Sequence, residues 1–183
     1  MNIFILHKDI QQNAQYHSDQ HVRKMILETA QLLSFCLHRF GAKEGFKKDK
    51  IYKYSKSHGE HPCAKWVYES TKNYRYLANL GIHLCIEYNY RFGKVHATTE
   101  VMRYLAARIP NIPKPPLTPF ALVMPTTYQR IDKIENKRVF RNAVKSYRNY
   151  YNHEKHTFKN GPATWTNREI PVWFKPQEKL TNA

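Results

Sequence analysis

Long apolar runs, paired cysteines and acidic residues are all scarce in this chain. No stretch approaches the roughly 18 consecutive apolar residues that a membrane-spanning helix requires. Residues 1–6 are too short for a signal peptide and contain no cleavage site. We therefore predict that the protein has no membrane partner and is cytoplasmic, in a bacterium or in a virus-infected cell.

Cysteine is too rare and too poorly spaced for a disulfide framework. The three cysteines, Cys36, Cys63 and Cys85, form no CxxC or other metal-binding spacing. Cys36 and Cys85 lie in apolar stretches with helical spacing, which predicts reduced core residues in a reducing compartment. We expect no bound metal and no cofactor.

Acidic residues are outnumbered by basic ones. The chain has 14 Asp and Glu against 30 Lys and Arg, which gives a formal charge of +16. A net charge of about 2–8 already keeps a small domain soluble, and a larger basic excess is typical of proteins that bind nucleic acid. Nucleic acid, most naturally duplex DNA, is the predicted partner, with a basic surface that serves only solubility as the alternative.

The apolar pattern predicts an all-α fold. The length of 183 residues and a hydrophobic share of 42% fit a single compact helical domain over residues 1–183. Apolar residues recur at helical spacing from Val22 to Phe40, and Gly41 is a typical helix end. The expected elements are an arm or strand over 2–6, a helix beginning within 9–20 and continuing to 40, one long central helix over 61–93, helices near 97–108, 118–123 and 136–152, a stiff connector over 110–119 with five prolines, and an irregular, aromatic-rich tail from 161.

One polar stripe on the first long helix has the composition of a reactive site. The residues His17, His21, Lys24, Glu28 and Gln31 are separated by 4, 3, 4 and 3 positions, so they share one helical face. This arrangement favours acid–base chemistry, with Glu28 as the base. His21 would either orient the Glu28 carboxylate or donate a hydrogen bond to a phosphate. Two readings stay open: a solvated face with a Lys24–Glu28 ion pair, and a divalent-metal site at His17, Asp19 and His21 without a further ligand.

The same residues carry a resemblance to a family. Ser18-Asp19-Gln20-His21, followed by Glu28 seven residues after the histidine, resembles the phage-type pyrimidine-dimer DNA glycosylases, the endonuclease V-like enzymes. This resemblance implies a small, basic, all-α enzyme in which Glu28 is the catalytic carboxylate, His21 is the matching histidine, and Arg23 or Lys24 contacts a phosphate. The segment 146–151 resembles the aromatic and basic tail of that family.

The chain departs from that family at its second and third residues. The resemblance implies a nucleophilic α-amine on a small second residue after Met removal, but Asn2 is too large for ordinary Met removal, so the amine would stay on Met1. Ile3 stands where the family has an arginine. Two alternatives therefore stay open. The protein forms an imine with the sugar and cleaves the strand, or it is a descendant of the family that excises or binds a base without lyase activity.

Basic and aromatic side chains alternate in several segments. Tyrosines interleave with Lys or Arg at 52–54, 74–76, 88–91 and 147–151, a pattern typical of surfaces that stack bases and hold phosphates. The predicted nucleic-acid contacts are Arg23, Lys24, Lys47, Lys48, Lys50, Arg91, Lys94, His96, Arg141, Lys145 and Arg148. The sequence thus predicts a glycosylase-like, base-processing DNA enzyme acting at a deoxyribose C1′, with a non-catalytic nucleic-acid-binding protein or a protein acting on free nucleotides as the alternatives.

Overall fold

The computed structural model describes residues 1–42, 46–53, 59–131 and 139–180, and these residues are mostly helical, as predicted. The helices are α1 (Ile10–Tyr16), α2 (Asp19–Phe40), α4 (Pro62–Glu69), α5 (Thr71–Phe92), α6 (Thr99–Ala106) and α7 (Arg141–Glu154), with 3₁₀ turns η1 (Lys48–Lys50) and η2 (Thr126–Tyr128). The strands β1 (Thr157–Phe158) and β2 (Gly161–Pro162) form a small antiparallel hairpin.

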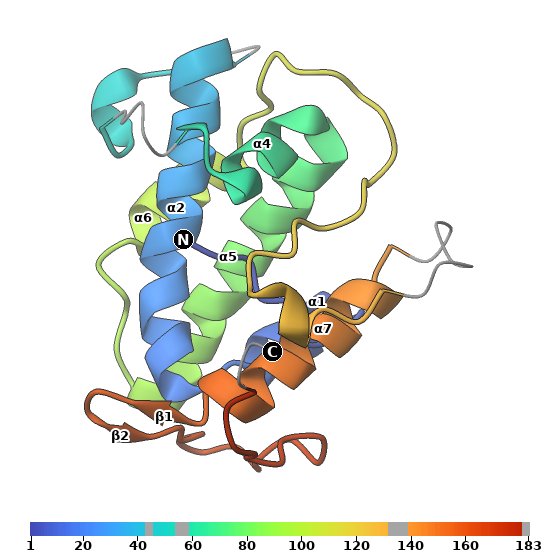
Figure 1. The fold of residues 1–183 in the computed structure, drawn as a ribbon. Coiled ribbons are helices and arrows are strands. Elements are labelled where there is room, and N and C mark those ends of the chain that lie inside the picture. The colour runs from blue at the N-terminus through green and yellow to red at the C-terminus, as the bar shows by residue number, and fades with distance from the viewer. Residues whose placement is uncertain (43–45, 54–58, 132–138, 181–183) are drawn as a thin grey trace.

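The core lies between α2 and α5, which run side by side through the molecule (Figure 1). Helices α4 and α6 pack against both of them, and α1 packs against α5. The helix that bears Glu28 therefore packs against both helices of the segment that begins at Pro62. At Gly81 side chains of two neighbouring helices fill the space of a Cβ, which would lie 2.2 Å from Cε of Met102 on α6 and 2.9 Å from Cγ2 of Thr29 on α2.

The first residues form a buried, extended segment rather than a strand. Residues 3–6 are all buried, yet they pair with no strand in the part of the chain that the structure describes. Asn13 supplies hydrogen-bond partners instead, since its Oδ1 accepts from the Leu6 N–H at 2.7 Å and its Nδ2 donates to the Phe4 carbonyl at 3.2 Å. A buried backbone needs such partners, and here one amide side chain supplies them.

The predicted long central helix is two helices. Ser70 is extended, with φ −151° and ψ 138°, and separates α4 from α5. Its hydroxyl accepts from the Lys72 N–H and donates to the Pro115 carbonyl at 2.6 Å. The proline-rich connector thus binds at the break, a contact between segments 45 residues apart that no local pattern contains.

Other boundaries also differ from the sequence-based expectation. Residues 118–123 are not helical, and the next described helical turn after them is the short η2. The last helix begins at Arg141 and runs to Glu154, while the first residues expected in it, 136–138, lie outside the described part of the chain. Gly41 ends α2 with φ 67° and Gly93 ends α5 with φ 62°, both as predicted, because glycine adopts positive φ without a steric penalty.

Candidate functional site

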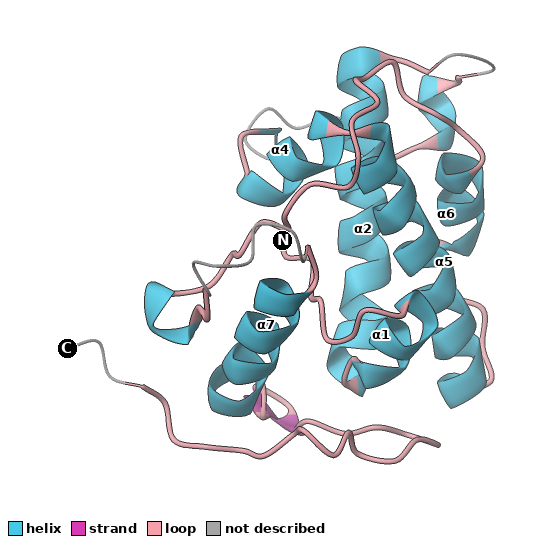
Figure 2. Ribbon diagram, turned by 90° about the vertical axis from the view of Figure 1, so that its right-hand side faces the viewer, coloured by secondary structure: helices cyan, strands magenta, loops and turns pink. Residues whose placement is uncertain are grey.

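The N-terminus of the chain meets the Glu28 carboxylate of α2. The main-chain N–H of Asn2 donates to Glu28 Oε2 at 3.2 Å, and the nitrogen of Met1 lies 4.0 Å from the same oxygen. The other oxygen, Oε1, lies 3.3 Å from Nζ of Lys24, one turn earlier on the helix. Both carboxylate oxygens therefore have partners, and the Glu28 side chain is 12% exposed. Figure 2 shows that the N-terminus lies between α2 and α7.

The buried N-terminal segment delivers Met1 to this position. Ile3, Phe4, Ile5 and Leu6 are all less than 5% exposed, so the chain is fixed up to its second residue. The ring of Phe4 stacks on His21 with centroids 4.3 Å apart. Apolar burial of these four side chains stabilises the segment by roughly several kcal/mol and holds it against α2.

Cys63 lies beside the same site. The main chain of Ile3 hydrogen-bonds to its sulfur, and the N-terminal charge and Glu28 both act on the thiol. Burial raises the pKa of Cys63 to about 12, so the group is a neutral thiol rather than a thiolate nucleophile. His61 caps α4 by accepting from the Cys63 N–H at 3.2 Å, so the segment from His61 to Cys63 both starts a helix and packs against the chain's first residues.

The polar stripe expected on one helix is divided by the structure. His17 lies at the end of α1 and not on α2, because the helix breaks at His17 and Ser18. Of the expected five, only Lys24, Glu28 and Gln31 remain at least partly exposed on α2. The alternative of a plain Lys24–Glu28 surface pair describes one of the three contacts that Glu28 makes.

His21 is a core residue. It is 5% exposed, hydrogen-bonds through Nδ1 to the Tyr151 hydroxyl, and stacks on Phe4. Burial lowers its pKa well below the ordinary histidine value, so the ring is neutral. Glu28 follows it seven positions later on the helix, about 10 Å along the axis. Its burial argues against the predicted phosphate contact, and its contact with Phe4 makes it a support of the N-terminal segment.

Asp19 anchors a buried ion network instead of a metal. Its Oδ1 lies 2.9 Å from Nη1 of Arg91, and its carboxylate accepts from the hydroxyls of Thr164 and Thr166 at 2.8 Å. Burial acts to raise the pKa of Asp19, but the hydrogen bonds from Thr166, Arg91 and Thr164 hold it below its usual range. Among the described residues, no three His, Cys, Asp or Glu side chains converge as a metal cluster would require.

The same network encloses Arg91. Its guanidinium is fully buried and donates to Glu87, to Asp19, and to the carbonyls of Gln15 and His17. Glu87 also binds Arg168 through two hydrogen bonds of 2.9 Å, which ties the C-terminal segment to α5. The prediction that Arg91 contacts phosphate does not fit this position, because the charge has no access to the surface and is neutralised within the fold.

Other predicted phosphate contacts lie together on the surface. Arg23 on α2 is exposed and stacks over Phe92 at 4.3 Å, and its main chain hydrogen-bonds to His96. Burial lowers the pKa of the half-buried His96. Lys94 is exposed in the same α5–α6 loop. Arg23 and His96 are thus in contact where α2 meets the α5–α6 loop that also carries Lys94, whereas Lys24 points toward Glu28.

The remaining predicted contacts occupy two other regions. Lys47, Lys48 and Lys50 are exposed at η1. Arg148 is half-buried, donates to the Leu6 carbonyl at 2.9 Å and stacks over Trp173, so much of its role is to hold the fold together. Arg141 is exposed at the start of α7.

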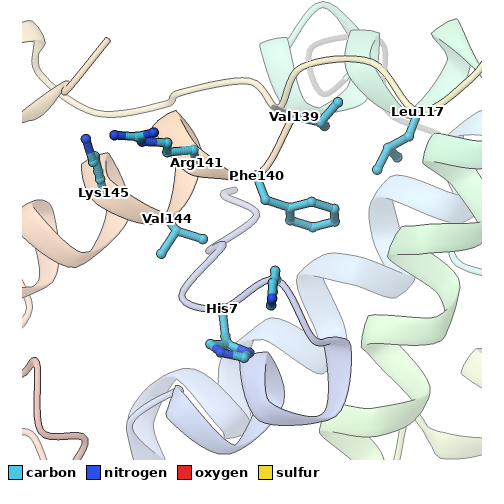
Figure 3. Close-up of a pocket in the computed structure, with 8 residues that line it drawn as sticks. His7, Leu117, Val139, Phe140, Arg141, Val144 and Lys145 are labelled. Atoms are coloured by element: carbon cyan, nitrogen blue, oxygen red, sulfur yellow. The ribbon is translucent and has the colours of Figure 1, made fainter. Parts of the chain in front are cut away.

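An open hollow borders the start of α7 (Figure 3). Its cavity volume is about 670 Å³, and its apolar lining surrounds the Phe140 ring. The lining residues are His7, Lys8, Leu117, Val139, Phe140, Arg141, Val144 and Lys145. None of the described residues that line the hollow is acidic, and two predicted phosphate contacts, Arg141 and Lys145, lie beside an apolar surface large enough for a nucleobase.

Sequence reasoning did not identify the residues that hold the N-terminus in place. In the sequence Tyr147 belongs to a segment of alternating tyrosines and basic residues and Asn2 stands out only for its size, but the two side chains are hydrogen-bonded across 145 residues. No spacing rule contains such a contact. The helical phase that points Tyr147 inward was the only available signal.

No helix in the described part of the chain has both the length and the apolar character needed to cross a membrane. Comparisons with protein-family models, curated proteins and solved structures find no significant match. The glycosylase resemblance therefore depends on the residues themselves and on the geometry around Glu28.

Proposed function

We propose that this protein is a glycosylase-like, base-processing enzyme of DNA that acts at a deoxyribose C1′. One observation carries the proposal: the Met1 nitrogen and the Asn2 N–H both face Oε2 of Glu28, at 4.0 and 3.2 Å. An amine beside a carboxylate is the pair needed to attack an electrophilic carbon and to accept the displaced proton. In the resembling family this pair uses the second residue, whereas here the first residue supplies the nitrogen.

The proposed step forms a bond between the Met1 nitrogen and C1′. As that bond forms, the glycosidic C–N bond breaks, and the base leaves with its electron pair and takes up a proton from solvent water. The amine gives its proton to Glu28. Met1 is 9% exposed and leads directly into the buried N-terminal segment, whereas the Lys24 side chain is 68% exposed on the surface of α2. This favours Met1 over Lys24, the other amine near Glu28.

The charge of the chain supports DNA as the substrate. The net charge of +16 attracts a polyanion, and the exposed Lys24 lies one turn before Glu28 on the same face of α2, with its Nζ 3.3 Å from Glu28 Oε1. A protein that binds DNA without chemistry would use the same cations, but it would need no nitrogen next to a partly buried carboxylate. Cytoplasmic DNA of a bacterium or of an infecting virus is the proposed setting.

A trapping experiment tests this function. The protein is incubated with a panel of damaged, modified and abasic duplexes, and released base and strand nicks are measured with and without borohydride. We expect at least one duplex to give a covalent protein–DNA adduct, and peptide mapping to locate the sugar on the peptide that begins with Met1. Intact mass of the protein first establishes that Met1 carries a free amine.

Two variants sharpen the result. Adding Gly-Ser before Met1 converts its nitrogen to an amide and should abolish the adduct with DNA affinity unchanged. Glu100→Gln, in an exposed ion pair on α6, is the matched control and should trap like the wild type. An adduct on the Lys24 peptide, or neither adduct nor released base from any duplex, would overturn the proposal.

A further inference from the structure

The side chain of Asn2 is held by two segments from the far end of the chain. Its Nδ2 donates to the Val123 carbonyl at 2.8 Å, and its Oδ1 accepts from the Tyr147 hydroxyl at 2.7 Å and from the Ile3 N–H at 2.9 Å. Both functional atoms of the amide are thus used. We call Asn2, Val123 and Tyr147 the N-terminal clamp.

Tyr147 is suited to hold this position. The side chain is fully buried on α7, and its hydroxyl lies 2.7 Å from both Asn2 Oδ1 and the Ala121 carbonyl. Burial raises the pKa of Tyr147 well above that of an ordinary phenol, so the hydroxyl keeps its proton and remains a donor. Since the connector at 121–123 and α7 meet at this hydroxyl, the clamp joins three separate parts of the chain.

The clamp determines where the first residue can be. The peptide N–H of Asn2 donates to Glu28, and its side chain is fixed on the opposite side by Val123 and Tyr147. Because the peptide bond between Met1 and Asn2 is planar, only the backbone rotations of Met1 itself can move the Met1 nitrogen. These rotations keep it close to Glu28. Fixing a reacting group before the substrate arrives removes an entropic part of the barrier.

We infer that Asn2 and Tyr147 are positioning residues that hold the Met1 nitrogen at the Glu28 carboxylate. This inference rests on the proposed function, since it explains how the reacting nitrogen is held. It also gives a reason for asparagine at position 2, because only an amide of this length offers both a donor to Val123 and an acceptor to Tyr147. Neither residue touches the substrate in this account.

The test measures borohydride trapping on a duplex with one abasic site, under single-turnover conditions. Tyr147→Phe removes one hydroxyl and leaves the ring. We expect its trapping rate to fall about 10- to 100-fold, the effect of misplacing a reacting group by about 1 Å, while its Kd for the abasic duplex stays within about twofold. Its pH–rate profile should also shift, because the amine is no longer held at the carboxylate.

Two controls separate positioning from general damage. Tyr74→Phe removes another fully buried hydroxyl, which donates to the Leu105 carbonyl at 3.0 Å, and should trap at the wild-type rate. Reductive methylation of Met1 with formaldehyde should proceed normally in Tyr147→Phe, since a small free aldehyde needs no positioned amine. This result would show that the amine is intact and only misplaced.

A second variant covers the case in which Tyr147→Phe does not fold. Asn2→Asp keeps the acceptor for Tyr147 and loses the donor to Val123, and it should also slow trapping at least about 10-fold without weakening DNA binding. Wild-type rates in the folded variants would overturn the inference and leave the proposed function intact. Absence of trapping in the wild-type protein itself would overturn both.

Discussion

Nη1 of Arg91 lies 2.9 Å from Oδ1 of Asp19, with both side chains at most 5% exposed. This ion pair joins the start of α2 to the end of α5, and through Thr164 and Thr166 it also holds the C-terminal segment. A charge so deeply buried is tolerated only while its partners remain, because desolvation of an unpaired ion costs several kcal/mol.

Replacing Arg91 should therefore destabilise the fold strongly. Arg91→Met leaves the carboxylates of Asp19 and Glu87 without their buried cation, and we expect a loss of about 3–5 kcal/mol in the free energy of unfolding, measured by urea denaturation. The control is Arg103→Met in the exposed Arg103–Glu100 pair, which should cost less than about 1 kcal/mol. Equal losses in the two variants would contradict the assigned role of the network.

Stability should fall as the pH is lowered from about 6.5 to about 4. Burial lowers the pKa of His17 to about 4, so between these values the unfolded chain binds a proton that the folded chain refuses. The stabilising difference is complete above pH 6.5 and is lost toward pH 4. His21, whose pKa is also lowered by burial, acts in the same direction. Asp19 and Glu87 add their own loss at lower pH, since their pKa values are held below the usual range despite burial.

Melting temperature against pH tests this in His17→Gln, whose amide can still donate to the Asn13 carbonyl as the His17 ring does at 2.7 Å. Between pH 6.5 and 4 the melting temperature of this variant should fall by several degrees less than that of the wild type, at about 2–4 °C per kcal/mol for a chain of this size. His83→Gln on α5 is the control. An unchanged slope in His17→Gln would show that His17 does not contribute.

Charge reversal at Lys47, Lys48 and Lys50 should weaken DNA binding equally for unrelated sequences. These exposed cations of η1 are expected to contact phosphates rather than bases. We expect the wild type to bind with a micromolar or lower Kd at low salt. The slope of the logarithm of the binding constant against the logarithm of the salt concentration should be smaller in magnitude by up to about 3 in the triple variant, since each phosphate contact contributes about 0.9. Fluorescence anisotropy measures both, with Lys72→Glu as a single-charge control, and an unchanged salt slope would exclude this region.

The periodic parts of the fold were predictable from the sequence. The apolar spacing from Val22 to Phe40 predicts the helix α2, and Gly41 predicts where it ends, because both signals are local. The break at Ser70 was not predictable in the same way. Its hydroxyl bonds to Pro115, and a pattern of apolar residues records no partner that lies on a distant segment.

The same distinction between local signals and contacts with distant segments applies to the candidate site. Glu28 was identified from its spacing to a histidine, a feature of one helix. The burial of His21 and Arg91 does not follow from the sequence pattern, because their partners Tyr151 and Asp19 lie on other elements and only Glu87 is a local partner of Arg91. The arrival of Met1 at Glu28 depends on the buried path of residues 3–6, which only the three-dimensional structure contains.

The central claim is that Glu28 is the reacting carboxylate, and one variant tests it most directly. Glu28→Gln retains the shape and the helix propensity of the side chain, so its melting temperature and its Kd for an abasic duplex should stay close to wild type. The single-turnover rate of borohydride trapping, measured beside Glu100→Gln, should fall about 100-fold or more, the usual effect of losing a general base. A Glu28→Gln protein that traps the abasic duplex at the wild-type rate would contradict the account.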